Sequence, residues 1–220
     1  MFHIALVDSE LETVPQELWG HQSVLKQARR RGKKPGNILL DSNFHHAAIK
    51  KYFPGEENRR GRPDIVQYFL LNTLESPLNL SGNLRVYVHT RENKVIFFDP
   101  STRIPKSYNR FIGLMEDLFH NHYVPSSNKP LLSICDMDLN GLIQKIKPSK
   151  IVVLNEKGNK IKIDEIIEDN MFFLIGGFPS GDFISNLNSF LNISIYHLPL
   201  PAWVVAYELV TSMEKFLGIF

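Results

Sequence analysis

The sequence predicts an α/β fold built around a mainly parallel sheet. Short apolar runs of strand length alternate with amphipathic stretches of helix length along the 220-residue chain, and this alternation is typical of parallel sheets with helices on their faces. No internal repeat or low-complexity stretch interrupts it. Because 43% of the residues are hydrophobic, the chain can bury one sizeable core. We therefore expect one domain over residues 1–220.

Each predicted strand is a short apolar run bounded by polar or turn residues. The first run is followed by Asp8 and Ser9, which favour a helix cap. Two later runs are separated by Arg91-Glu92-Asn93, and this pattern predicts a hairpin inserted on the sheet. The predicted strands are residues 2–7, 84–90, 94–99, 131–135, 151–154, 171–175 and 193–198.

Each predicted helix has apolar residues at helical spacing or a clear end signal. Gly32 and Pro35 end the first helix, and Asp41 and Ser42 precede the second. The third, at residues 64–74, is apolar on nearly every face, which indicates a buried helix. The predicted helices are residues 16–31, 44–52, 64–74, 107–120, 139–146 and 202–217.

Cysteine content and hydropathy indicate the compartment. The single cysteine, Cys135, builds no disulfide framework, which suits a reducing cytoplasm. The apolar run at residues 2–7 is too short for a signal peptide and has no basic residues before it. No apolar run approaches the roughly 18 residues of a membrane helix. We expect a cytoplasmic protein with no membrane contact.

Basic residues gather in three clusters in the first half of the chain, although the net charge is only +2. Such clusters are usually solvated surface, but three that join would form a positive face that attracts phosphate. The sequence leaves both interpretations open. The clusters are Lys26, Arg29, Arg30, Arg31, Lys33 and Lys34; Arg59, Arg60 and Arg62; and Arg103, Lys106 and Arg110.

A loop with three glycines, Gly176, Gly177 and Gly181, follows a buried predicted strand. Glycine lets a backbone turn tightly and approach a ligand closely. The loop is not a phosphate loop, because Asp182 and Phe183 stand where Lys and Ser or Thr are needed. It also lies too close to the C-terminus for a dinucleotide motif. A ligand without phosphate, such as S-adenosylmethionine, and an ordinary strand-to-helix turn both stay open.

Four stretches, taken in order, give a more specific prediction. The stretches are residues 40–46, residues 62–79, residues 103–115, and the glycine loop at 171–183 with residues 193–196 and Ala202-Trp203 behind it. With these motifs the chain resembles, over essentially its whole length, the pseudouridine N(1)-methyltransferases of small-subunit ribosome biogenesis, which belong to the SPOUT class. The Phe178-Pro179-Ser180-Gly181-Asp182 loop, and the lack of a long N-terminal extension, are similar to archaeal members.

The resemblance implies a SPOUT-type sheet with a C-terminal trefoil knot. Residues 171–217 would hold the knot, the S-adenosylmethionine site and a homodimer interface. The last predicted helix fits a dimer because Trp203, Tyr207 and Phe216 place apolar surface on more than one face, although a buried core helix gives the same pattern. The cofactor-binding residues that the resemblance implies are Gly176, Gly177, Gly181, Ile193, Ser194, Ile195, Tyr196, His197 and Leu198.

The resemblance also implies an RNA-binding extension at about residues 54–110. Lys106 stands where the family often has Arg, so the charge is kept but the bidentate fork is lost. Arg62, oriented by Asp64, would stabilise charge on a carbonyl oxygen of the target base during transfer. Asp64 could equally cap the following helix, and the two roles are compatible. The implied RNA-contacting residues are Arg62, Arg103, Lys106 and Arg110.

The function predicted from this resemblance is S-adenosylmethionine-dependent methylation of N(1) of a pseudouridine in a small-subunit rRNA stem-loop, with the base flipped out. A second copy of the chain and pre-ribosomal proteins are the other expected partners. We expect no metal, because His45-His46 and His120-Asn121-His122 point their histidines apart on a helix. Two alternatives stay open: an RNA-binding assembly factor with secondary or lost activity, and a SPOUT enzyme acting on another base or a ribose.

Overall fold

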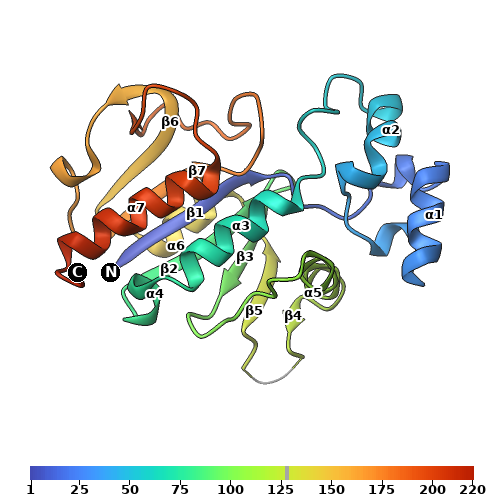
Figure 1. Cartoon of the computed structure of the whole chain (residues 1–220), viewed down its shortest axis with the longest axis horizontal. Helices are drawn as coiled ribbons and strands as arrows, with labels where there is room; N and C mark the ends of the chain where they lie inside the picture. The colour runs from blue at the N-terminus through green and yellow to red at the C-terminus, as the bar shows by residue number, and fades with distance from the viewer. Residues whose placement is uncertain (127–128) are drawn as a thin grey trace.

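An eight-stranded sheet runs through the computed structural model, which describes residues 1–126 and 129–220 (Figure 1). The strand order within this described part is β4-β5-β3-β2-β1-β7-β6-β8. The strands are β1 (Phe2–Ser9), β2 (Leu84–Thr90), β3 (Lys94–Phe98), β4 (Tyr123–Val124), β5 (Leu132–Asp136), β6 (Lys150–Lys160), β7 (Met171–Gly176) and β8 (Leu191–Ser194).

The half of the sheet from β2 to β8 is parallel throughout. Leu6 of β1 pairs with Ile175 of β7, and Ile175 pairs with Leu154 of β6, which in turn pairs with Ile193 of β8. The strands β3, β4 and β5 are antiparallel to their neighbours. The prediction of a mainly parallel α/β sheet is confirmed. Because parallel strands end at the same edge, the chain leaves β6, β7 and β8 side by side.

Helices cover both faces of the sheet, as the two-residue period of the strands requires. Ile4 and Leu6 point into one core beneath α3 and α7, while Ala5 and Val7 point into a second core that includes α6. Figure 1 shows α3 and α7 crossing in front of the sheet. The helices are α1 (Gln22–Arg31), α2 (Ser42–Tyr52), α3 (Pro63–Leu74), α4 (Pro77–Leu80), α5 (Tyr108–Asn121), α6 (Leu139–Ile146) and α7 (Ala202–Phe216).

The predicted hairpin is present as β2 and β3, but it is not added to the outside of the sheet. Strand β2 pairs in parallel with β1 and takes an interior position. The part that projects from the sheet is instead the lobe of α1 and α2, at the right of Figure 1, with a small core of its own around Val24 and Ile49. Sequence patterning showed the hairpin but not its neighbours, because strand order is a long-range property.

Several predicted elements have different ends, and the strand expected at residues 151–154 is much longer because β6 continues to Lys160. The helix expected at residues 16–31 is split into a 3-10 turn, Gln16–Leu18, and α1, whose cap is His21. The strand expected at residues 193–198 ends at Ser194. Asp8 caps no helix: it lies inside β1 with a φ of 52° and accepts hydrogen bonds from a distant loop, as described below.

Candidate functional site

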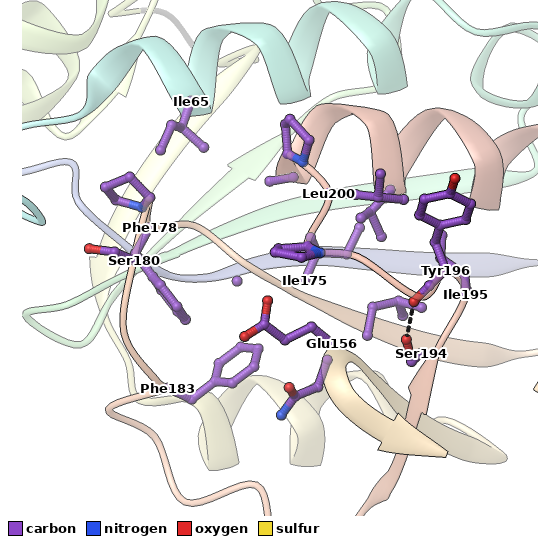
Figure 2. Close-up of a pocket in the computed structure, with 18 of the residues that line it drawn as sticks. Ile65, Glu156, Ile175, Phe178, Ser180, Phe183, Ser194, Ile195, Tyr196 and Leu200 are labelled. Carbon is purple, nitrogen blue, oxygen red and sulfur yellow. Dashed lines mark hydrogen bonds between the residues drawn. The ribbon is translucent and has the colours of Figure 1, made fainter. Parts of the chain in front are cut away.

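A cavity of about 430 Å³ lies where the β6–β7 ladder ends at Leu154 and Ile175, beside the end of β8. Leu154, Ile175 and Ile193, one from each strand, contribute to its apolar lining, as Figure 2 shows for Ile175. In open α/β sheets, ligands bind at the carboxyl ends of parallel strands. A volume in this range is typical of small-molecule sites.

The first two glycines of the loop after β7 have different surroundings. A Cβ on Gly176, which lines the cavity, would lie 2.9 Å from the ring of Phe178. A Cβ on Gly177 would lie 2.3 Å from Oγ of Ser9. The N–H of Gly177 donates to Val7 O at 2.7 Å, and its carbonyl accepts from Glu10 N at 3.1 Å. Gly177 is therefore used to pack the loop on the end of β1, and its backbone hydrogen-bonding groups face the protein.

The loop at residues 178–185 forms one wall of the cavity and is fixed from two sides. Asp8 accepts hydrogen bonds from the backbone N–H groups of Ile184 (2.7 Å) and Ser185 (2.9 Å), and from Oγ of Ser185 (2.7 Å). Arg59 donates to the carbonyl of Asp182 at 2.7 Å. Its guanidinium also lies 4.2 Å from the centre of the Phe178 ring. Both contacts bring residues from far along the chain to hold the wall in place.

The opposite wall is the segment between β8 and α7. Oγ of Ser194 donates to the carbonyl of Tyr196 at 2.6 Å, which turns the chain after the strand (Figure 2). The cavity lining then continues through Leu198 to Trp203 and Val205 at the start of α7. The ring of Trp203 lies 5.2 Å from that of Tyr68 on α3. This wall therefore packs against α3, the helix that begins directly after Arg62.

Arg62 lines the same cavity and is held by Asp64. Its Nε and Nη2 donate to the two carboxylate oxygens of Asp64 at 2.9 and 2.7 Å. These hydrogen bonds raise the pKa of Arg62 above its usual value, against the opposing effect of burial. Asp64 makes no side-chain cap to α3, whose cap residue is Arg62. The predicted orientation of Arg62 by Asp64 is thus present in the geometry, and the alternative capping role is not.

The other predicted RNA-contacting residues lie beside α3 but outside the cavity lining. Gln67 of α3 donates to the carbonyl of Pro105 at 2.8 Å, which fixes the segment that carries Arg103 and Lys106. Nζ of Lys106 lies 3.6 Å from Glu75. Arg103 and Arg110 are exposed. One helix therefore places its N-terminal arginine at the cavity and positions an exposed basic segment along its side.

Two arginines of the second basic cluster are turned toward buried carboxylates rather than toward solvent. Arg60 is 7% exposed and forms a two-bond ion pair with the buried carboxylate of Glu12, at 2.6 and 2.9 Å. Arg59 likewise donates to the buried Glu10 at 2.7 Å. Burial is the main reason that the pKa of Glu12 is raised, despite this pairing. The interpretation of this cluster as a phosphate-attracting surface is therefore wrong for Arg59 and Arg60, whose partners lie at positions that the sequence does not reveal.

The structure brings most of the predicted cofactor residues together. Gly177 and His197 are the two that do not line the cavity; His197 is exposed and its ring lies 4.2 Å from that of Tyr196. Lining residues missing from the prediction come from the middle of β6, the far part of the glycine loop, Ile65 of α3, and the segment that leads from residue 199 into the start of α7. The β6 residues could have been found, because the predicted strand at residues 151–154 must end beside the glycine loop in a parallel sheet. The predicted residues in the lining are Gly176, Gly181, Ile193, Ser194, Ile195, Tyr196 and Leu198.

The described residues contain no group of three His, Cys, Asp or Glu side chains that could hold a metal ion. In the same part of the chain, no helix has the length and apolar character needed to cross a membrane.

Comparison with known proteins identifies what the chain is similar to. It matches the EMG1/NEP1 methyltransferase family over residues 4–214. It is 46% identical over 223 residues to the ribosomal RNA small subunit methyltransferase Nep1 of Staphylothermus marinus, covering 98% of this chain and 96% of that protein. It is 48% identical to the same-named protein of Thermococcus sibiricus, covering 97% and 98%. The crystal structure of Archaeoglobus fulgidus Nep1 bound to S-adenosylhomocysteine has a TM-score of 0.88 at 33% identity, covering 98% of both chains.

Proposed function

Because the chain belongs to the EMG1/NEP1 methyltransferase family, we propose that it transfers a methyl group from S-adenosylmethionine to small-subunit rRNA, at N(1) of a pseudouridine. One observation carries the proposal: Arg62, held by Asp64, lines the cavity at the ends of the parallel strands. A methyl donor in the cavity and a base bound by Arg62 would therefore lie next to each other. Reactants held together in this way react as if at high local concentration.

The cavity lining suits S-adenosylmethionine better than a phosphate-bearing cofactor. Leu154, Ile175 and Ile193 offer apolar contact to an adenine ring, and Gly176 at the end of β7 also lines the cavity. Arg62 is the one cationic side chain of the lining in the described residues, and its fork is already bound to Asp64. The bound cofactor would supply an electrophilic methyl group on its sulfonium.

Arg62 would act on the target base. Pseudouridine presents a ring N(1)–H next to a carbonyl group, and negative charge develops on that carbonyl oxygen as the nitrogen loses its proton. The Asp64 carboxylate occupies Nε and Nη2 of Arg62, which leaves Nη1 free of hydrogen bonds within the described residues. An N–H donor that is already oriented stabilises developing charge without reorganising.

The exposed segment beside α3 would bind the RNA backbone. Arg103 and Arg110 are exposed, and Lys106 is 80% exposed at its side chain, with a single long ion pair to Glu75. Arginine forks match phosphate oxygens and set the register of an RNA without reading its sequence. The base would leave its stem-loop and enter the space beside Arg62, as enzymes that modify bases require. The described part of residues 54–110 would thus supply the RNA-binding extension.

A second copy of the chain would complete the assembly, in the cytoplasm and with pre-ribosomal proteins as further partners. Exposed aromatic side chains on α3 and α7 support a dimer: Tyr68 is 48%, Tyr207 56% and Phe216 51% exposed. Large apolar groups gathered on packed helices are typical of protein interfaces. The trefoil threading of residues 171–217 stays a prediction of the resemblance.

The competing assembly-factor function is less well supported because a pure RNA-binding module has no use for the cavity. The test is transfer of labelled methyl groups from S-adenosylmethionine to small-subunit and large-subunit rRNA prepared without this modification. We expect label in the small-subunit RNA alone, and much less with Arg62→Ala than with Arg29→Ala, an exposed arginine outside the cavity lining. Tight binding of RNA without any transfer of label would favour the assembly factor.

A further inference from the structure

Glu156 places a carboxylate in the cavity that no other group engages. It lines the cavity and is exposed. Figure 2 shows the Glu156 side chain extending from within β6 into the space on the side of the Phe183 ring. Among the described residues, no hydrogen bond or ion pair reaches its oxygens. A carboxylate that faces a ligand site without a protein partner is available to a positively charged group of the ligand.

A bulge in β6 aims this side chain. Leu154 and Asn159 both pair with Ile193 of β8, so residues 155–158 are extra to the ladder and bend out of it. Bulges of this kind re-aim side chains next to functional sites. Gly158 permits the bulge, because a Cβ there would lie 2.6 Å from backbone atoms of Ile193. The position of Glu156 is therefore set by the backbone conformation of the bulge.

The other charged groups of the lining are already neutralised. Arg62 is bound to Asp64 at 2.7 Å. Asp182 is bound to Lys157 at 2.6 Å. The Lys157 ammonium also attracts the Glu156 carboxylate, but it forms its ion pair with Asp182. Within the described lining, Glu156 is left as the one charged side chain with neither a hydrogen bond nor an ion pair.

We infer that Glu156 is the counter-ion of the sulfonium, and that it sets the preference of the site for the methyl donor over the demethylated product. This inference rests on the proposed function. S-adenosylmethionine and S-adenosylhomocysteine share the adenosine, the ammonium and the carboxylate, and differ in the methyl group and the positive charge on sulfur. On transfer the C–S bond breaks and its electron pair stays on sulfur. The C–N bond forms, and the N(1) proton passes to water. The attraction to Glu156 is thereby lost, which favours release of the product.

The charge of Glu156 should affect binding of the methyl donor rather than the transfer step. Glu156 attracts the positive charge before the reaction, and that charge disperses toward the transition state. An interaction that is stronger in the bound reactant than in the transition state lowers KM and does not raise kcat. Removing the charge of Glu156 should therefore raise KM for S-adenosylmethionine, while kcat stays the same or rises slightly.

Calorimetric binding to Glu156→Gln tests the inference with three ligands. S-adenosylmethionine carries the sulfonium, sinefungin carries an ammonium near the same place, and S-adenosylhomocysteine carries neither. We expect Kd for S-adenosylmethionine and for sinefungin to rise about tenfold, because each loses a charge pair that is shielded from water by the bound ligand. Kd for S-adenosylhomocysteine should change by less than about twofold. The matched control is Glu165→Gln, an exposed carboxylate outside the lining that should alter none of the three.

Equal weakening of all three ligands would overturn the inference, because it would place Glu156 at the shared amino-acid end. No change in any of them would also overturn it. Glu156→Asp, which keeps the charge with a shorter reach, should retain part of the preference and so separates charge from folding effects. If the unmodified protein bound none of the ligands, the proposed function itself would fail.

Discussion

Removing the carboxylate of Asp8 should open the wall of the cavity. The side chain is 1% exposed and accepts three hydrogen bonds from Ile184 and Ser185, at 2.7–2.9 Å. These are the contacts that tie residues 183–185, including the cavity residue Phe183, to the end of β1. In Asp8→Ala, all three donors lose their protein acceptor.

The size of this effect follows from the exposure of the donors. Hydrogen bonds to charged groups contribute about 1.5–3 kcal/mol each. Ile184 is 55% exposed, so water replaces part of each bond, and about 1 kcal/mol for each of three bonds gives about 3 kcal/mol. Arg59 still holds Asp182, so the wall should loosen without the whole protein unfolding. We expect Kd for S-adenosylhomocysteine to rise at least about tenfold, since about 1.4 kcal/mol corresponds to that factor.

Calorimetry and hydrogen exchange would test this prediction together. Exchange should accelerate at the amides of Ile184 and Ser185 while the amides of β1 and β7 stay protected. Asp136→Ala is the control, because Asp136 is exposed and its carboxylate is bound, among the described residues, only to Lys94. An unchanged Kd together with fast exchange at Ile184 would refute the idea that this wall is needed for ligand binding.

Three further predictions concern single residues. Arg62→Ala should lower kcat with saturating RNA by about 100-fold, because it removes a donor aimed at developing charge, and full turnover would disprove that role. Gly177→Ala should lower the free energy of unfolding by about 1–3 kcal/mol through overpacking against Ser9, 2.3 Å from the added Cβ; urea denaturation at an unchanged midpoint would contradict it. Burial lowers the pKa of His45 to about 4, and its Nδ1 accepts the N–H of Asp41 at 3.0 Å. The unfolded chain then binds more protons than the folded one between pH 6.5 and 4, so stability should fall by about 3 kcal/mol as pH is lowered through that window, and His45→Gln should flatten the loss.

Local patterns in the sequence predicted the elements but not their partners. Asp41, which accepts from Asn43 N at 2.9 Å, caps α2, and Gly32 at a φ of 62° ends α1, because capping depends on neighbouring residues alone. Arg60 shows the opposite case. Its buried partner, Glu12, lies 48 positions away, and no local pattern distinguishes an arginine that folds inward from one that faces solvent.

The part of the candidate site that lies at the ends of predicted strands could be predicted from the sequence. The glycine loop pointed to the cavity because it follows a buried strand, and Gly176 and Gly181 do line it. Glu156 was missed because its position depends on a bulge, which arises only from pairing with β8. Similarly, Gly177 faces Ser9 rather than the cavity, since β1 and β7 meet only in the folded sheet.

The most direct test of the central claim uses two matched stem-loop RNAs that differ at one loop position, pseudouridine in one and uridine in the other. Each is incubated with the protein and labelled S-adenosylmethionine, and the labelled nucleoside is identified by mass spectrometry. We expect N(1)-methylpseudouridine from the first RNA and no label in the second. Equal labelling of both RNAs, or label on a ribose, would contradict it.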